Sequence, residues 1–134
     1  MSTKTIVTEF ESRHQFLDFL KSNPGHIVVK FGADWCGPCK KIHDEVEDFF
    51  SKCPENVICC DIDIDDSFDL YAYLKTKKMA NGIPVIMVWK KGSEDYIPDH
   101  TYVGSDKAGL NEFVNLMLSN LSLIHISEPT RPFH

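Results

Sequence analysis

The stretch IVVKFGADWCGPCK, residues 27–40, decides the fold class of this 134-residue chain. Residues 27–31 are almost continuously apolar, which is typical of a strand buried on both faces of a sheet. A loop is predicted at 32–35, and apolar residues then recur at helical spacing from Cys36 until Pro54 ends the pattern. Cys36 therefore stands where a buried strand gives way to a helix.

Outward from this stretch, the chain alternates between strand and helix patterns. Further strands are predicted at 5–8, 57–64, 84–89 and 101–103, and further helices around 16–20 and 70–74 and from a cap at Ser105 through Leu118. The order β-α-β-α-β-α-β-β-α implies parallel pairing, with helices on both faces and an antiparallel hairpin at the edge. We therefore expect one α/β domain with a central mixed sheet, spanning residues 1–120.

The last stretch, residues 121–134, differs from the rest of the chain. It holds two prolines and shows no continuation of the helical period. It is similar to the peptide obtained by translating a sequencing adapter or a vector read-through. We therefore expect an irregular, non-native tail, the alternative being a genuine irregular one; neither would carry chemistry.

Composition and charge exclude several classes of function. No apolar run approaches the roughly 18–20 residues that span a bilayer, so no membrane association is expected. The formal net charge of −6 disfavours nucleic acid as a partner, because phosphates demand clustered Lys and Arg. The first residues lack the layout of a secretory signal peptide, and five cysteines are an odd number for a secreted disulfide framework. We therefore expect a protein of the cytoplasm.

The chemistry of the chain is expected at Cys36 and Cys39. Two cysteines at i and i+3 on the first turn of a helix lie near disulfide range. A helix N-terminus offers unpaired N–H groups and partial positive charge, which stabilise a thiolate. Cys36, at the helix mouth, is the better placed and more exposed nucleophile, and Cys39 suits a shielded resolving thiol. Gly37 lets the loop approach a partner, Pro38 suits a first helical turn, and Lys40 adds positive charge.

The implied reaction is thiol–disulfide exchange, which needs no organic cofactor. The Cys36 thiolate attacks a substrate disulfide, and Cys39 then resolves the mixed disulfide and releases the reduced substrate. A zinc site would need a second pair of ligands at suitable spacing. Cys59 and Cys60 are adjacent on a predicted strand and point to opposite faces, so no metal site is expected.

Residues 5–118 resemble the thioredoxin family. The resemblance rests on four motifs: WCGPCK at 35–40, Gly82-Ile83-Pro84 before a strand, Lys90-Lys91-Gly92 at the hairpin, and Val103-Gly104 before the last helix. It implies the thioredoxin fold and a protein-disulfide reductase whose partners are oxidised substrate proteins and a thioredoxin-reductase-type electron donor. A monomer is expected. The alternatives are an oxidase or isomerase variant, and a binding module that holds a partner protein without turnover.

The resemblance also assigns residues around the dithiol. It implies a cis peptide bond between Ile83 and Pro84, a backbone pairing of Ile83 with substrate, and a position of Pro84 over Cys36 and Cys39. Four residues would surround the dithiol as an apolar docking surface: Trp35, Pro38, Ile83 and Gly104. The alternative for Trp35 is simple packing in the core.

The sequence departs from the family at a buried ion pair. The position of the family's buried carboxylate, six residues before the first cysteine, is Lys30 here, and Asp61 stands where the family often has a lysine. A buried lysine is costly unless it is paired, so we predict a Lys30–Asp61 interaction beneath Cys39. Either Asp61 exchanges a proton with Cys39, or Lys30 lowers the pKa of Cys39 directly. The alternative is a Lys30 that reaches solvent and has no catalytic role.

Three smaller features carry expectations. Asp44 occupies the position of a helix-kinking proline in the family, so we expect a straighter helix. The segment 93–100 is longer than the usual hairpin connection and is interpreted as slack, with an extra recognition loop as the alternative. Cys53, Cys59 and Cys60 are expected to behave as inert small hydrophobes, with Cys53 the most exposed.

Overall fold

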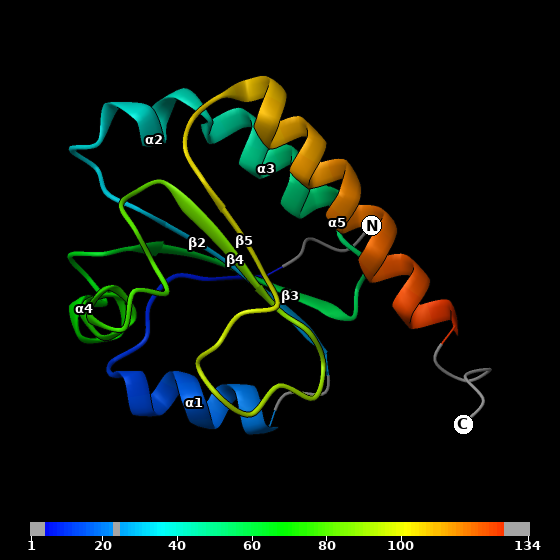
Figure 1. Ribbon diagram of the computed structural model, residues 1–134, viewed down its shortest axis with the longest axis horizontal. Coiled ribbons are helices and arrows are strands. Elements are labelled where there is room, and N and C mark those ends of the chain that lie inside the picture. Colours follow the sequence, from blue (N-terminus) through cyan, green and yellow to red (C-terminus); the bar gives the residue numbers. More distant parts are fainter. Residues whose placement is uncertain (1–4, 23–24, 128–134) are drawn as a thin grey trace.

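The computed structural model describes residues 5–22 and 25–127, and within these residues five strands form one mixed sheet (Figure 1). The strand order is β1-β3-β2-β4-β5. The strands are β1 (Ile6–Val7), β2 (His26–Gly32), β3 (Val57–Asp63), β4 (Val85–Trp89) and β5 (His100–Val103). β1 and β2 pair with β3 in parallel, whereas β4 is antiparallel to both β2 and β5.

Helices cover both faces of this sheet, as predicted (Figure 1). One face carries α1 (Arg13–Ser22) and α4 (Phe68–Thr76). The other carries α3 (His43–Lys52) and α5 (Lys107–Ser127), and the short α2 (Gly37–Lys41) leads into α3. The order of strand and helix patterns in the sequence is therefore confirmed.

The central strand β2 is buried along its whole length, and its side chains alternate between two cores. Val29 and Phe31 belong to the core under α1 and α4, and Val28 belongs to the core under α3 and α5. Because side chains alternate along a strand, Lys30 and Gly32 share the face of Val28. This face leads toward α2 and its two cysteines.

The direction of β4 differs from the parallel pairing that the alternating pattern predicted. Val85, at the start of β4, is paired with Phe31, near the end of β2. The chain thus enters β4 at the same end of the sheet at which β2 and β3 finish. In Figure 1, α4 is seen end-on while the strands run across the view, so this helix does not carry the chain back along β3.

The helix after the cysteines is not straight, although Asp44 replaces the family's proline. A turn at Ile42, with φ −105° and ψ 12°, separates α2 from α3. The side chain of Ile42 is completely buried against the core under α3 and α5. The prediction of a straighter helix is therefore wrong, and the turn coincides with the burial of an apolar side chain.

The last helix runs further than expected. Its buried residues follow a helical stripe that continues into the first residue of the predicted tail: Leu110, Val114, Met117 and Leu121. α5 itself continues to Ser127, so the expectation of an irregular tail is wrong for residues 121–127, and residues 128–134 lie outside the described part of the chain. The cap is Asp106 and not Ser105, because the Asp106 Oδ2 accepts a 2.9 Å hydrogen bond from the Gly109 N–H.

The connection between β4 and β5 is tied down and is not slack. The Tyr96 hydroxyl donates a 2.7 Å hydrogen bond to the carbonyl oxygen of Arg13. Its ring lies 4.6 Å from that of Tyr73 and stacks on Phe16, centroid to centroid at 6.5 Å. Figure 1 shows this loop reaching down to α1. The interpretation as slack is wrong because an aromatic side chain anchors the segment to both helices of that face.

Candidate active site

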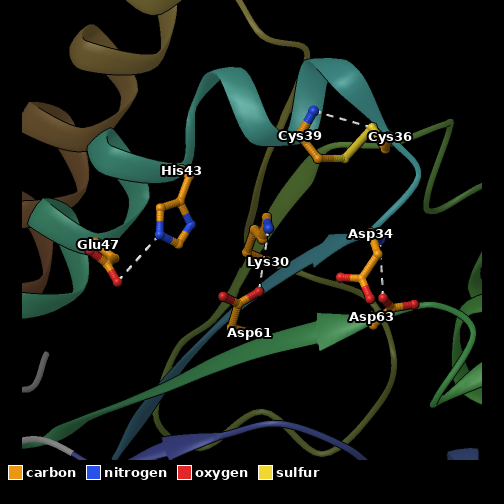
Figure 2. A network of polar contacts seen from close by, with 8 residues as sticks. All are labelled: Lys30, Asp34, Cys36, Cys39, His43, Glu47, Asp61 and Asp63. Carbon is orange, nitrogen blue, oxygen red and sulfur yellow. Dashed lines mark hydrogen bonds and ion pairs between the residues drawn. A yellow bond between two sulfur atoms is a disulfide. The ribbon is translucent and has the colours of Figure 1, made fainter.

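Cys36 and Cys39 are joined by a disulfide at the start of α2, with their Cα atoms 5.3 Å apart (Figure 2). Cys36 is the N-cap of the helix, and its Sγ accepts a 3.2 Å hydrogen bond from the backbone N–H of Cys39. Pro38 lies in the first turn, as predicted. An N–H aimed at a sulfur favours its charged form. The local geometry therefore suits a thiolate on Cys36 once the disulfide is reduced.

Both cysteines are shielded from solvent. Cys36 is 6% exposed and Cys39 is 3% exposed. Cys36 is thus the more exposed of the two, as predicted, but it is not openly accessible to solvent. Ala33 packs with the pair, and Ile64 and Ile83 lie against it. A partner protein must therefore come into direct contact with this rim to reach Cys36.

The peptide bond between Ile83 and Pro84 is cis, as the resemblance implied. Ile83 is half-buried against the dithiol, whereas Pro84 is buried at the start of β4. The Gly104 N–H donates a 3.1 Å hydrogen bond to the Pro84 carbonyl oxygen. Gly104 has a φ of 128°, a backbone conformation that favours glycine. Residues 83, 84 and 104 are thus brought together at the end of the sheet where the cysteines lie.

Trp35 lies on the surface beside the cysteines and is not part of the core. It is 65% exposed, which makes the alternative of simple core packing wrong. Its Nε1–H donates a 2.9 Å hydrogen bond to the Asp65 Oδ2. Gly37 and Pro38 are also exposed. A large apolar ring held at one edge is available for contact with another molecule.

The predicted ion pair between Lys30 and Asp61 is present. The two residues are directly opposite each other on β2 and β3, and the Lys30 Nζ lies 3.4 Å from the Asp61 Oδ1 (Figure 2). The Lys30 side chain is 10% exposed and that of Asp61 is 39% exposed. The alternative in which Lys30 extends into solvent is therefore wrong.

A pocket of about 510 Å³ opens next to this ion pair and reaches Cys39. Its charged lining is mixed, with Lys30, Lys40 and His43 opposed by Asp34, Asp61 and Asp63. Figure 2 shows both pairs below the disulfide, with Asp34 and Asp63 under Cys36 and with Lys30 and Asp61 further to the left. Cys39, and not Cys36, lines this pocket. The resolving cysteine therefore has a charged environment of its own.

One group of possible metal ligands occurs among the described residues: His43, Asp44 and Glu47 on α3. All three are exposed, and the His43 Nε2 lies 3.4 Å from the Glu47 Oε2 as an i,i+4 pair (Figure 2). Such pairs are common on helix surfaces without an ion. The cluster includes no cysteine, and the expectation of no metal site stays a prediction.

The other three cysteines are buried. Cys59 and Cys60 lie in opposite cores, as their adjacent positions on β3 predicted. Burial, and then the neighbouring Cys59, raise the pKa of the Cys60 thiol far above its ordinary value. Cys53 is the most exposed of the three, as expected, but at 7% it is still buried, in the core under α3 and α5. Its position at a helix end suggested exposure, but the side chain turns inward.

Sequence reasoning missed Asp65 and Gly32. Asp65 follows β3 and Trp35 follows β2, and the carboxyl ends of parallel strands meet at one edge of a sheet. The run of aspartates between 61 and 66 was therefore a usable signal for a contact with the loop after β2. Gly32 lines the pocket together with Lys30 and Cys39. The sequence carries no signal for this, because it depends on where the side chains of Lys30 and Cys39 lie.

Comparison with known proteins identifies the family. The thioredoxin family model matches residues 7–116, which is most of the chain. The chain belongs to the thioredoxin family. Sheep thioredoxin is 32% identical over 117 residues, covering 84% of this chain and all of the relative, and horse thioredoxin is 36% identical over 93 residues, covering 66% and 81%.

Solved thioredoxin structures share the fold. The structure of Trichomonas vaginalis thioredoxin is similar with a TM-score of 0.66 and 21% identity, covering 86% of this chain and 99% of that one. The thioredoxin fold expected from the motifs is thus confirmed. The match to the thioredoxin family supports a redox-active Cys36–Cys39 disulfide. In the part of the chain that is described, no helix combines the length and apolar character needed to cross a bilayer.

Proposed function

We propose that this thioredoxin-family chain is a protein-disulfide reductase that acts by dithiol–disulfide exchange through Cys36 and Cys39. The observation that carries the proposal is the Cys36–Cys39 disulfide at the start of α2, packed against Ile83 of the cis bond. A pair that already forms a disulfide within a short turn can exchange two electrons without rearranging the fold. No resident cofactor is needed for this step.

The reaction proceeds in two exchanges from the reduced protein. The Cys36 thiolate attacks one sulfur of a substrate disulfide, forming an intermolecular disulfide and releasing the other substrate sulfur as a thiolate. Cys39 then attacks the Cys36 sulfur, which restores the Cys36–Cys39 disulfide and frees the second substrate sulfur. The substrate gains two electrons and the protein loses two. A thioredoxin-reductase-type donor then returns them to the pair.

The substrate is held by the surface around the dithiol. Trp35, Gly37 and Pro38 form its exposed part, and Ile83 and Gly104 lie partly buried beside them. We assign the pairing with the substrate chain to the Ile83 backbone, with Pro84 beneath it. An apolar surface that touches backbone rather than specific side chains accepts many oxidised proteins.

Lys30 is assigned the tuning of Cys39, and Asp61 the placement of Lys30. The ion pair lies in the pocket that Cys39 lines, and Lys30 is the more buried partner. A positive charge near a sulfur favours the thiolate and lowers its pKa. Asp61 is the more exposed member, so it serves better to hold Lys30 than to exchange a proton with Cys39.

We place this activity in a monomer in a reducing compartment such as the cytoplasm. Its partners are oxidised substrate proteins and the reductase-type donor, with no role for nucleic acid or membrane. The net charge of −6 fits the exclusion of nucleic acid. A reducing environment keeps the dithiol ready for the next substrate.

Reduction of insulin disulfides, coupled to NADPH and a thioredoxin reductase, tests the proposal. We expect turnover by the wild-type chain, none by Cys36→Ser, and a trapped intermolecular disulfide with Cys39→Ser. Binding of oxidised insulin by a Cys36→Ser, Cys39→Ser variant without any turnover by the wild type would favour the binding module instead. The redox potential of the Cys36–Cys39 couple distinguishes a reductase from the oxidase or isomerase alternative. The potential of thioredoxin is about −270 mV and that of protein disulfide isomerase is about −180 mV.

A further inference from the structure

Gly32 is the last residue of β2 and lies two residues beyond Lys30, on the same face of the sheet. Its φ is not in the positive range that favours glycine, unlike that of Gly82, Gly92 or Gly104. Glycine weakens a strand because it has no side chain to pack, and it often marks a place where other atoms approach closely. The backbone conformation therefore does not explain why a glycine stands here.

The space above Gly32 does offer an explanation. A Cβ atom at this position would lie 3.0 Å from the Lys30 Nζ and 3.2 Å from the Lys30 Cε. The same Cβ would lie 3.2 Å from the Cys39 Sγ. The end of the lysine side chain and the sulfur of the resolving cysteine thus border one small space, which the missing side chain leaves open. In contrast, a Cβ at Gly37 would meet nothing within 4 Å.

We propose that Gly32 is a positioning residue that lets the Lys30 ammonium lie beside the Cys39 sulfur. The proposal rests on the function proposed above, in which Lys30 favours the Cys39 thiolate. Of the two neighbours, Cys39 has a short, buried side chain on α2, whereas the end of the long Lys30 side chain is flexible. A methyl group on residue 32 would therefore push the end of Lys30 aside by a few tenths of an ångström and occupy the space through which its charge acts on the sulfur.

Other charged groups lie close to Cys39 and must be considered in any pH dependence. They line the same pocket: Asp34 and Lys40 on the segment from β2 to α2, His43 on α3, and Asp61 and Asp63 on β3. The three atoms nearest to a Cβ at Gly32 are the Lys30 Nζ and Cε and the Cys39 Sγ, so the change acts first on that pair.

The experiment is an NMR titration of the Cys39 Cβ carbon in the reduced, full-length protein. We expect Gly32→Ala to raise the pKa of Cys39 in the same direction as Lys30→Met but by less, because the lysine charge is pushed aside and not removed. An opposite charge within about 4–6 Å lowers a thiol pKa by about 1 or more, so Lys30→Met itself should raise the pKa of Cys39 by about 1. The double variant Lys30→Met, Gly32→Ala should titrate like Lys30→Met alone. Gly32→Val should reproduce the effect of Gly32→Ala or exceed it.

The outcomes separate this proposal from the one on which it rests. If Gly32→Ala raised the pKa of Cys39 equally in the wild-type and the Lys30→Met backgrounds, the role of Gly32 would be overturned and that of Lys30 would stay intact. An unchanged Cys39 pKa in Lys30→Met would overturn both roles, while insulin turnover would still decide whether the chain is a reductase. If Gly32→Ala fails to fold, the wild-type protein provides the test: a nuclear Overhauser effect between the Lys30 Hε and Gly32 Hα protons is expected in the reduced state, and its absence contradicts the proposal.

Discussion

The Nε1–H of Trp35 donates a 2.9 Å hydrogen bond to the Asp65 Oδ2, joining the loop after β2 to the segment after β3. The bond fixes the direction of a ring that is otherwise largely in contact with solvent. An exposed aromatic side chain that is already ordered loses less conformational freedom when a partner binds. Asp65 is thus part of the proposed docking surface although it need not touch the substrate.

Asp65→Ala should weaken substrate capture without unfolding the protein. Loss of one hydrogen bond that orders Trp35 is worth about 0.5–1.5 kcal/mol, so we expect the KM for a protein disulfide to rise about 2- to 10-fold. Steady-state insulin reduction measures the change. Asp66→Ala is the matched control, since it removes the same charge at the next exposed position. An equal rise in KM for Asp66→Ala would show that charge, and not the hydrogen bond to Trp35, is responsible.

Lys30→Met and Asp61→Asn should move the pH dependence of the reaction in opposite directions. Without the lysine charge the pKa of Cys39 rises, so the pH–rate profile of the second exchange should shift upward by about one pH unit. Asp61→Asn keeps an Oδ1 that can still accept from the Lys30 ammonium but removes the negative charge, which favours the Cys39 thiolate and should shift the profile downward. Stopped-flow release of reduced substrate measures both. A loss of rate at all pH values in Asp61→Asn, without a shift, would instead assign proton transfer to Asp61.

Tyr96→Phe should destabilise the fold while leaving the active site intact. The change removes the 2.7 Å hydrogen bond to the Arg13 carbonyl but keeps the ring contacts, so the free energy of unfolding should fall by about 0.5–1.5 kcal/mol. Urea unfolding and amide exchange over residues 93–99 measure this. Tyr102→Phe removes a hydroxyl bonded to the Asp106 carbonyl at an exposed site and should cost less. A changed kcat/KM in Tyr96→Phe would contradict the assignment of this loop to structure alone.

The parts of the fold that the sequence predicted correctly depend on local pattern. The buried strand before Cys36 is a continuous apolar run, and the cysteine spacing places both sulfurs on one turn. The predictions of a parallel β4 and of a straighter helix through Ile42 were wrong, because both features depend on how a segment packs against distant parts of the chain. Tyr96 was also misjudged, since its partners Arg13 and Tyr73 are far away in the chain.

The candidate site was predictable to a similar extent. The Lys30–Asp61 pair could be predicted because the resemblance to the thioredoxin family matches both positions to a pair of facing residues, and the register of β2 and β3 agrees. Asp65 and Gly32 could not be assigned from residue type alone, because one acts through the orientation of an indole ring and the other through a space shared by two side chains. The aspartates between 61 and 66 indicated a contact with the loop after β2, but which of them orients the ring, and the role of Gly32, depend on side-chain positions.

His100→Gln should make the protein less sensitive to mild acid. His100 stands at the start of β5, where burial, and then the positive charge of Lys90, lower its pKa, against the opposing effect of Asp99. Its Nε2 is buried and has no hydrogen-bond partner among the described residues. In the unfolded chain the pKa of a histidine is about 6.5, so below about pH 6.5 the unfolded state binds more protons at His100 than the folded state does. The contribution of His100 to the free energy of unfolding that is present above about pH 6.5 is therefore lost as the pH falls. Urea unfolding between about pH 7 and 5 should show a shallower decline in the free energy of unfolding for His100→Gln than for wild type. His14→Gln, at an exposed position of α1, is the control and should keep the wild-type slope. Equal slopes for wild type and His100→Gln would rule His100 out as the source of the acid sensitivity.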